Sequence, residues 1–140
     1  MAIGDEPKPN IPPVEVKEKK VVKILYAEDD KIWRRTLQDL LEYRGCVVEA
    51  VENGKILLEK LATGAYDLVL TDNDMPVLTG IQALKKIREM EGLRDLPVIV
   101  FSGRSSDLEK YVTGLGGTCL NKASTEDLFP AIERALKSDK

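Results

Sequence analysis

Histidine is absent from the 140 residues of the chain, and aromatic side chains make up only 5% of them. Without histidine the chain lacks the commonest general base and the usual zinc ligand of proteins. The two cysteines, Cys46 and Cys119, are interpreted as small buried hydrophobic residues, and a disulfide between them is not expected. These absences disfavour zinc chemistry, histidine-dependent catalysis and a disulfide-stabilised fold.

Long hydrophobic runs and an excess of one charge are also missing. No apolar run approaches the roughly 20 residues that cross a bilayer, and the N-terminus has no apolar signal core. The 21 basic and 24 acidic residues are interspersed and give a net charge of −3. A non-specific nucleic-acid surface needs a clustered basic excess. We therefore expect a cytoplasmic protein that contacts neither a membrane nor nucleic acid directly.

The distribution of proline divides the chain into two parts. Residues 1–20 contain four of the seven prolines and many charged residues. Such a segment buries too little apolar area to offset the entropy lost on ordering, so we predict a disordered tail or linker there. Residues 21–138 have the length and composition of one globular domain.

Within this domain, apolar runs alternate with segments of helical periodicity. Near-continuous apolar strands that alternate with helices indicate a parallel sheet covered on both faces. Right-handed crossovers favour the flavodoxin-like α/β fold, a doubly wound five-stranded parallel sheet in the order 2-1-3-4-5. The expected strands are 21–27, 46–51, 66–71, 97–102 and 118–121, and the expected helices are 30–44, 54–63, 80–91, 105–115 and 125–137.

Local signals predict several details of these helices. Asn53 is a plausible N-cap of the second helix, and Ser124 with Asp127 resembles a capping box for the fifth. Pro130 predicts a kink or a frayed first turn in that last helix. The first helix is expected to place its apolar residues on one side, namely Ile32, Trp33, Leu37, Leu40 and Leu41.

Polar residues follow four of the predicted strands at their carboxyl ends. Ligands of open α/β sheets bind at that edge, so these side chains are expected to converge. Carboxylate oxygens suit Mg²⁺, whereas a hydroxyl and an ammonium group suit the outer oxygens of a phosphoryl group. An aspartate beside Mg²⁺ can act as a nucleophile toward phosphorus. The residues are Glu28, Asp29, Asp72, Ser102 and Lys122.

With these motifs in place, residues from about 21 to 138 resemble a response-regulator receiver domain of the two-component family. The resemblance implies that Asp72 accepts a phosphoryl group from a histidine kinase or phosphotransfer protein. Because this chain has no histidine, the donor must bring its own or be a small phosphodonor. The matching positions are Glu28-Asp29, Asp72, Met75-Pro76, Gly80, Ser102 and Lys122.

The resemblance also implies roles for the other site residues. Asp29 would ligate Mg²⁺ directly, Glu28 mostly through water, and Asp74 through its main-chain carbonyl. Ser102 would bind the phosphoryl group and shift on activation, with Lys122 as its charge partner. A receiver of this kind is not an enzyme beyond assisting its own phosphorylation and dephosphorylation.

Two departures from the family pattern affect the expected output. Lys122 precedes Ala123, where family members usually carry proline after a cis peptide, and a cis bond before a non-proline residue costs about 2.5–4 kcal/mol. Cys119 replaces the family's switch aromatic, three residues before the lysine. The usual coupled movement of serine and aromatic ring cannot occur in that form.

Two further residue positions suggest functional hypotheses. Asp74 and Arg104 are expected to pair across the mouth of the site and to screen the water that attacks the acyl phosphate; an exposed pair of little consequence is the alternative. Trp33, the only tryptophan, either packs in the core or contacts the phosphodonor.

Two other functions are compatible with the sequence. A binding-only pseudo-receiver would keep the fold and signal through protein contacts alone. A Mg²⁺-dependent phosphatase or nucleic-acid enzyme would use Asp72, Asp74 and Glu28, but it would not require Ser102 and Lys122 at these strand ends. The sequence names neither the downstream target nor the oligomeric state, and we expect a monomer or a weak homodimer.

Overall fold

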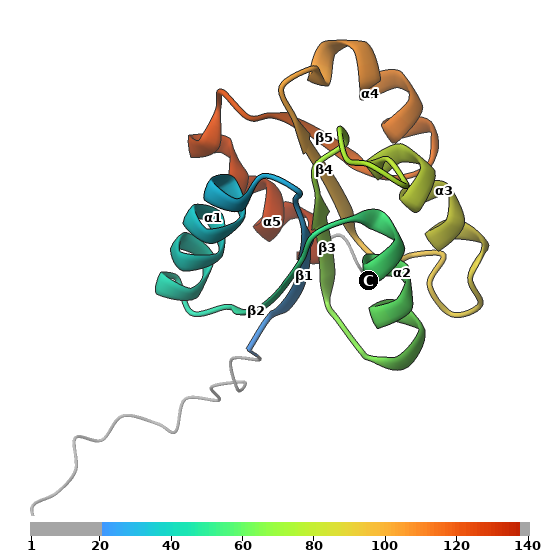
Figure 1. Cartoon of the computed structure of the whole chain (residues 1–140), viewed down its shortest axis with the longest axis horizontal. Coiled ribbons are helices and arrows are strands. Elements are labelled where there is room, and N and C mark those ends of the chain that lie inside the picture. Colours follow the sequence, from blue (N-terminus) through green and yellow to red (C-terminus); the bar gives the residue numbers. More distant parts are fainter. Residues whose placement is uncertain (1–20, 138–140) are drawn as a thin grey trace, which may run out of the picture.

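The computed structural model describes residues 21–137, so the tail predicted for residues 1–20 lies outside the described residues. Within 21–137 the chain forms a five-stranded parallel sheet in the order β2-β1-β3-β4-β5, which confirms the predicted topology (Figure 1). The strands are β1 (Lys23–Ala27), β2 (Val47–Val51), β3 (Leu68–Thr71), β4 (Val98–Ser102) and β5 (Thr118–Asn121).

Helices cover both faces of this sheet. Helices α1 and α5 pack on one face around Leu37, Leu41 and Ile132, and α2, α3 and α4 pack on the other (Figure 1). The helices are α1 (Lys31–Tyr43), α2 (Gly54–Thr63), α3 (Gly80–Glu89), α4 (Ser105–Gly114) and α5 (Leu128–Lys137), and a 3₁₀ turn, η2 (Thr125–Asp127), precedes α5. No helix in the described range is both long and apolar enough to span a membrane.

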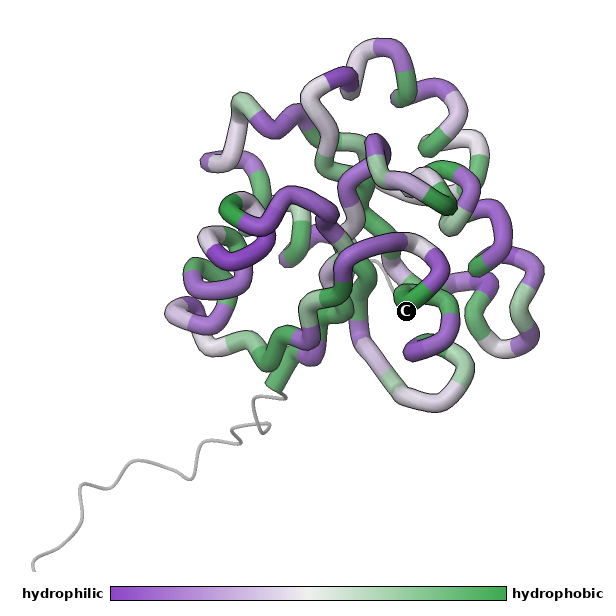
Figure 2. Tube along the Cα trace, viewed as in Figure 1, coloured by the Kyte–Doolittle hydropathy of each residue, from purple (hydrophilic) through white to green (hydrophobic). Residues whose placement is uncertain are grey.

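The strands are apolar along their length because both of their faces are buried. In β1, Ile24 and Tyr26 face the core under α1 and α5, while Leu25 and Ala27 face the core under the other three helices. Figure 2 shows hydrophobic residues along much of the sheet, and hydrophilic residues recurring along the surrounding helices. This pattern is the one expected for a parallel sheet covered on both sides.

The helix starts agree with the sequence in some places and differ in others. Asn53 caps α2, as predicted, by accepting from the main-chain N–H groups of residues 55 and 56. The capping box predicted at Ser124 was wrong, because its side chain makes no cap hydrogen bond and the chain first forms the 3₁₀ turn. The α-helix begins only at Leu128, so Pro130 falls in its first turn, where a missing N–H costs little.

The apolar side predicted for the first helix is also partly wrong. Leu37 and Leu41 are buried, but Ile32 is 75% exposed and Leu40 lies at the exposed margin. Successive residues turn by about 100° around a helix, so Ile32 lies about 140° away from Leu37. Only the stripe that includes positions 33, 37 and 41 faces the sheet.

Arg88 of α3 links this helix to the neighbouring elements. Its guanidinium donates to four main-chain carbonyls, including those that end α4. The accepting carbonyls and distances are Leu115 at 2.7 Å, Leu96 at 2.8 Å, Gly116 at 3.2 Å and Leu93 at 3.3 Å. One side chain therefore fixes the C-terminal end of α4 and the approach to β4.

Candidate functional site

The carboxyl ends of the strands bring together the five strand-end residues selected from the sequence. Ala27 of β1 pairs with Thr71 of β3, so the next residues, Glu28 and Asp72, leave the sheet side by side. Ser102 is the last residue of β4, and Lys122 directly follows β5. The register of a parallel sheet thus gathers side chains that lie up to 94 positions apart in sequence.

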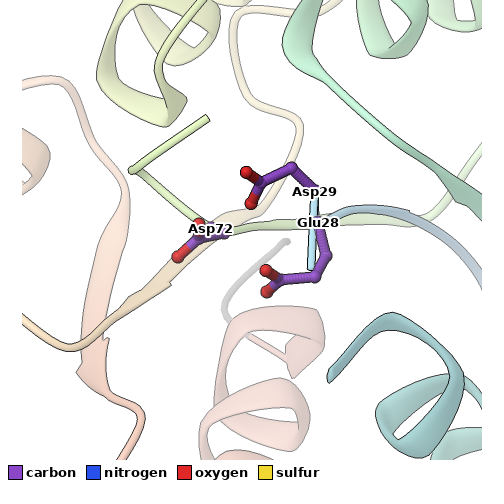
Figure 3. A group of neighbouring side chains, drawn as sticks. All are labelled: Glu28, Asp29 and Asp72. Carbon is purple, nitrogen blue, oxygen red and sulfur yellow. The ribbon is translucent and has the colours of Figure 1, made fainter. Parts of the chain in front are cut away.

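Three carboxylates form the acidic part of the site. One oxygen each from Glu28, Asp29 and Asp72 can be chosen so that all lie within 4.8 Å of one another. Figure 3 shows the three carboxylate groups pointing to the same side. Glu28 and Asp72 are almost fully buried, while Asp29 is exposed. Oxygen donors of this kind fit a hard divalent cation such as Mg²⁺.

Burial and mutual repulsion change the acidity of the central carboxyl group. Burial, followed by the charge of Glu28, raises the pKa of Asp72 from 3.8 to about 6, and Lys122 opposes this rise. The charge of Asp74 adds a smaller upward contribution. The ionised form of Asp72 is therefore costly in the free protein, so a cation at the site would stabilise it.

Lys122 offsets part of this repulsion directly. Its Nζ atom lies 2.8 Å from Glu28 Oε1 and 3.2 Å from Asp72 Oδ1. Burial alone lowers the pKa of Lys122, but the hydrogen bond to Glu28 and the charges of Asp72 and Glu28 outweigh burial and raise it. The site holds three carboxylates and one ammonium group, so it keeps a negative balance that favours a further cation.

Glu28 is fixed by its surroundings as well as by Lys122. Its Oε2 accepts from the main-chain N–H of Asp30 at 3.2 Å, and Arg34 donates to its main-chain carbonyl at 2.8 Å. The Tyr26 hydroxyl donates to Glu28 Oε1 at 3.5 Å. These contacts hold the carboxylate at the buried side of the site.

Ser102 is fully buried at the end of β4. Its Oγ accepts from the main-chain N–H of Arg104 at 3.0 Å, and its carbonyl accepts from the main-chain N–H of Lys122 at 3.1 Å. The second bond ties the end of β4 to the residue that carries the ammonium group. Ser102 and Lys122 are thus linked through the backbone.

The loop after Asp72 packs tightly against the start of α3. A Cβ atom on Gly80 would lie 2.5 Å from the carbonyl oxygen of Asp72, so only glycine fits there. Asn73 Oδ1 accepts from the N–H of Ile81 at 3.0 Å, and Thr79 forms a capping box with Gln82. The sequence analysis missed Asn73 and this box, although Thr79 followed three positions later by glutamine is a recognisable signal.

The same loop contains a strained turn. Val77 has a φ of 72°, and the N–H of Leu78 donates to the carbonyl of Pro76 at 2.7 Å. A hydrogen bond across three residues with positive φ at the centre is a γ-turn of the rare, strained kind. A β-branched residue in this region is unfavourable by about 1–3 kcal/mol.

Asp74 and Arg104 form the pair expected at the mouth of the site. Arg104 NH1 lies 3.9 Å from Asp74 Oδ1, and the two side chains are 60% and 53% exposed. Arg104 also lies 3.8 Å from Asp107. The side chain of Asp74 is not one of the three clustered carboxylates, and the role predicted for its main-chain carbonyl stays a prediction.

The connection after β5 has its own hydrogen bonds. No peptide bond in residues 21–137 is cis, so Lys122–Ala123 is trans. Asn121 Oδ1 accepts from the N–H of Ala123 at 2.7 Å, and its Nδ2 donates to Ser105 Oγ at 3.1 Å. Half-buried Cys119 lies with its Sγ 3.6 Å from the carbonyl of Ser105. Asn121 therefore links this loop to the start of α4, where the sequence analysis had identified no contact.

The sequence matches a known protein family. Residues 24–132 match the family model described as the response regulator receiver domain. Two-component response regulator ORR42 of Oryza sativa subsp. japonica is 33% identical over 108 residues, which cover 76% of this chain and 81% of that protein. The 3′,5′-cyclic-nucleotide phosphodiesterase regA of Dictyostelium discoideum is 42% identical over 88 residues, or 61% of this chain, but this match spans only 11% of regA.

Solved structures share the fold. The Francisella response regulator 1452 receiver domain has a TM-score of 0.76 and 28% identity, covering 85% of this chain and 99% of that one. Response regulator TrrA of Thermotoga maritima, solved in complex with Mg²⁺-BeF, has a TM-score of 0.74 and 24% identity, covering 83% and 100%. TrrA in complex with the histidine kinase ThkA is similar at a TM-score of 0.73 and 23% identity, covering 83% and 99%.

Proposed function

The chain belongs to the response regulator receiver domain family, and from this membership we propose that Asp72 is its phosphoacceptor. The observation that carries the proposal is the ion pair of Lys122 with both Asp72 and Glu28, at the edge where Ser102 ends β4. The Lys122 ammonium thus contacts the Asp72 carboxylate, and the Ser102 hydroxyl lies at the carboxyl end of the strand that neighbours β3. A phosphoryl group joined to Asp72 requires such neighbours.

In the proposed reaction, a carboxylate oxygen of Asp72 attacks phosphorus in a phosphohistidine or a small phosphodonor. An O–P bond forms, the bond between phosphorus and the leaving group breaks, and an acyl phosphate results. The Lys122 ammonium then exchanges part of its contact with the carboxylates for a phosphoryl oxygen. The raised pKa makes the Asp72 carboxylate a stronger base, but only the ionised carboxylate can attack phosphorus.

The acidic cluster supports a role for Mg²⁺ in this reaction. Glu28, Asp29 and Asp72 would hold the ion, with the main-chain carbonyl of Asp74 as a further ligand. Bound Mg²⁺ neutralises negative charge on phosphoryl oxygens. TrrA has been solved with Mg²⁺-BeF, which is consistent with this assignment.

The phosphoryl group would bias an equilibrium between two conformations of the domain. Ser102 is proposed to follow the phosphoryl group and to change the surface formed by α4, β5 and α5. The donor would be a histidine kinase or phosphotransfer protein, as the complex of ThkA with TrrA suggests. We propose residues 21–138 as the receiver, preceded by a tail or linker over 1–20, in a cytoplasmic protein.

The test is intact mass spectrometry after incubation with phosphoramidate or acetyl phosphate. We expect a gain of one phosphoryl group that requires Mg²⁺ and is absent in Asp72→Asn. A matched control is Asp67→Asn, which alters a carboxylate at the opposite edge of the sheet, bonded to the N–H of Lys23. This control should still gain the phosphoryl group.

Several other results would contradict the proposal. If no adduct forms and beryllofluoride also fails to bind, a binding-only pseudo-receiver becomes the better explanation of Cys119 and Ala123. Multiple turnover on a phosphate ester would instead indicate a Mg²⁺-dependent phosphatase. Unchanged adduct formation in Asp72→Asn would assign the phosphoryl group to another residue.

A further inference from the structure

We propose that Trp33 positions the Lys122 ammonium group for phosphoryl transfer by presenting the face of its indole ring. The inference rests on the proposed function and adds a residue of α1 to the site. Trp33 would not touch the phosphoryl group, so its role is positioning rather than catalysis. Its contact with Lys122 has to be separated from its contribution to the core.

The first observation is the contact itself. Lys122 Nζ lies 4.7 Å from the centroid of the Trp33 ring. The face of an aromatic ring is electronegative, and indole attracts cations more strongly than the other aromatic side chains do. The Lys122 side chain is only 16% exposed, so water screens this attraction less than it would at the surface.

The second observation is that the ring is held in place. Trp33 meets fully buried Phe101 edge to face, with centroids 6.0 Å apart and an interplanar angle of 81°. The N–H of Trp33 donates to Asp30, the N-cap of α1, and its carbonyl accepts from the Tyr26 hydroxyl at 3.4 Å. Main chain and ring are therefore both fixed, and the ring gives the ammonium a rigid neighbour.

The third observation is the number of elements that meet at one nitrogen atom. Lys122 contacts Glu28 after β1, Asp72 after β3 and Trp33 in α1. Lysine carries its charge on a flexible four-carbon stem and is not fixed in direction by its own bonds. The ring and the two carboxylates together restrict the ammonium to the region beside Asp72.

The loop that carries Lys122 fixes the main chain but not the end of the lysine side chain. Ala123 follows the lysine and, unlike proline, does not fix its own φ angle. The main chain at this point is held by hydrogen bonds to Ser102 and Asn121. We therefore assign to Trp33 the positioning of the ammonium group at the end of the Lys122 side chain.

The test compares the phosphorylation rate of wild-type protein, Trp33→Phe and Trp33→Leu with phosphoramidate and Mg²⁺, followed by intact mass. Leucine removes the ring, whereas phenylalanine keeps an aromatic face. We expect Trp33→Leu to react about fivefold more slowly and Trp33→Phe to recover most of the rate. All three proteins should reach the same final extent of modification.

A matched control separates positioning from stability. Leu37 is buried on the same face of α1 as Trp33, whereas the ammonium group of Lys122 contacts Glu28, Asp72 and Trp33. Leu37→Ala therefore removes packing from this face and leaves those three contacts in place. Its thermal midpoint should fall at least as far as that of Trp33→Leu, while its phosphorylation rate should stay within about twofold of wild type.

The outcomes distinguish the two proposals. If wild-type protein is phosphorylated and Trp33→Leu reacts at the same rate, the role of Trp33 is refuted and Asp72 remains the phosphoacceptor. The role of Trp33 is refuted as well if Leu37→Ala slows the reaction as much as Trp33→Leu does. If wild-type protein gains no phosphoryl group, the proposed function fails and the inference fails with it.

Discussion

Removing the charge of Asp72 is predicted to stabilise the metal-free protein at neutral pH. Asp72 is 4% exposed, and burial together with Glu28 raises its pKa from 3.8 to about 6. At about 1.4 kcal/mol per pKa unit, this rise corresponds to about 3 kcal/mol of lost stability once the group is ionised. This pKa already includes the opposing attraction of Lys122, so the net expected gain in stability for Asp72→Asn is about 3 kcal/mol.

The predicted gain depends on pH in a definite direction. A raised pKa means that between about pH 4 and pH 6 the folded state holds its proton while the unfolded state has released it. The contribution of Asp72 to stability therefore falls as pH rises through this window and stays low above it. Below about pH 4 the group is protonated in both states, so the gain from Asp72→Asn should disappear.

The assay is urea unfolding in the presence of EDTA, at about pH 7.5 and about pH 4. Asp39→Asn is the control, because Asp39 is an exposed carboxylate paired with Arg35 at 3.3 Å. The change in the free energy of unfolding caused by Asp39→Asn should stay within about 0.5 kcal/mol at both pH values. The reasoning is refuted if Asp72→Asn is no more stable than wild type at neutral pH. A gain of equal size at acidic pH would refute it too.

Three further substitutions test the framework of the site. Gly80→Ala should lower the free energy of unfolding by about 2 kcal/mol and slow phosphorylation, because its Cβ would meet the Asp72 carbonyl. The control Gly114→Ala, with open space around the new Cβ, should be neutral or slightly stabilising in the same urea assay. Thr79→Ala should cost about 1 kcal/mol in that assay through loss of the capping box. Arg88→Ala should speed hydrogen exchange at the C-terminal end of α4, because it removes four bonds to main-chain carbonyls; unchanged exchange there would contradict this role.

The sheet and the meeting of the acidic residues were predictable from the sequence. Apolar runs buried on both faces fix the parallel arrangement, and right-handed crossovers leave few strand orders. Once β1 and β3 are neighbours, Glu28 and Asp72 must leave the sheet together. No knowledge of side-chain conformation is needed for this step.

Contacts that depend on side-chain direction were not predictable in this way. The sequence placed Lys122 at the correct edge, but not its shared pairing with Glu28 and Asp72. It left open whether Trp33 packs in the core, and the ring in fact contacts both Phe101 and Lys122. Such contacts follow from rotamers and from packing between distant elements.

The start of the last helix shows a second limit of sequence reasoning. Ser124 has the right residue type for a cap, yet its φ of −118° and ψ of 62° belong to a different local shape. Its N–H donates to the carbonyl of Asn121, and its own carbonyl accepts from the N–H of Asp127. A tight turn after β5 therefore takes precedence over the helix signal.

The turn at Val77 keeps a backbone conformation that lowers the stability of the protein. Glycine or asparagine would adopt the same positive φ with less strain, so the sequence holds a less stable residue than the backbone allows. The loop keeps its form because Met75 is buried below it and Gly80 abuts the Asp72 carbonyl. The buried Met75 and the close approach of Gly80 therefore hold an unfavourable turn in the loop that follows Asp72, and loosening this packing would let the turn relax to a lower-energy conformation.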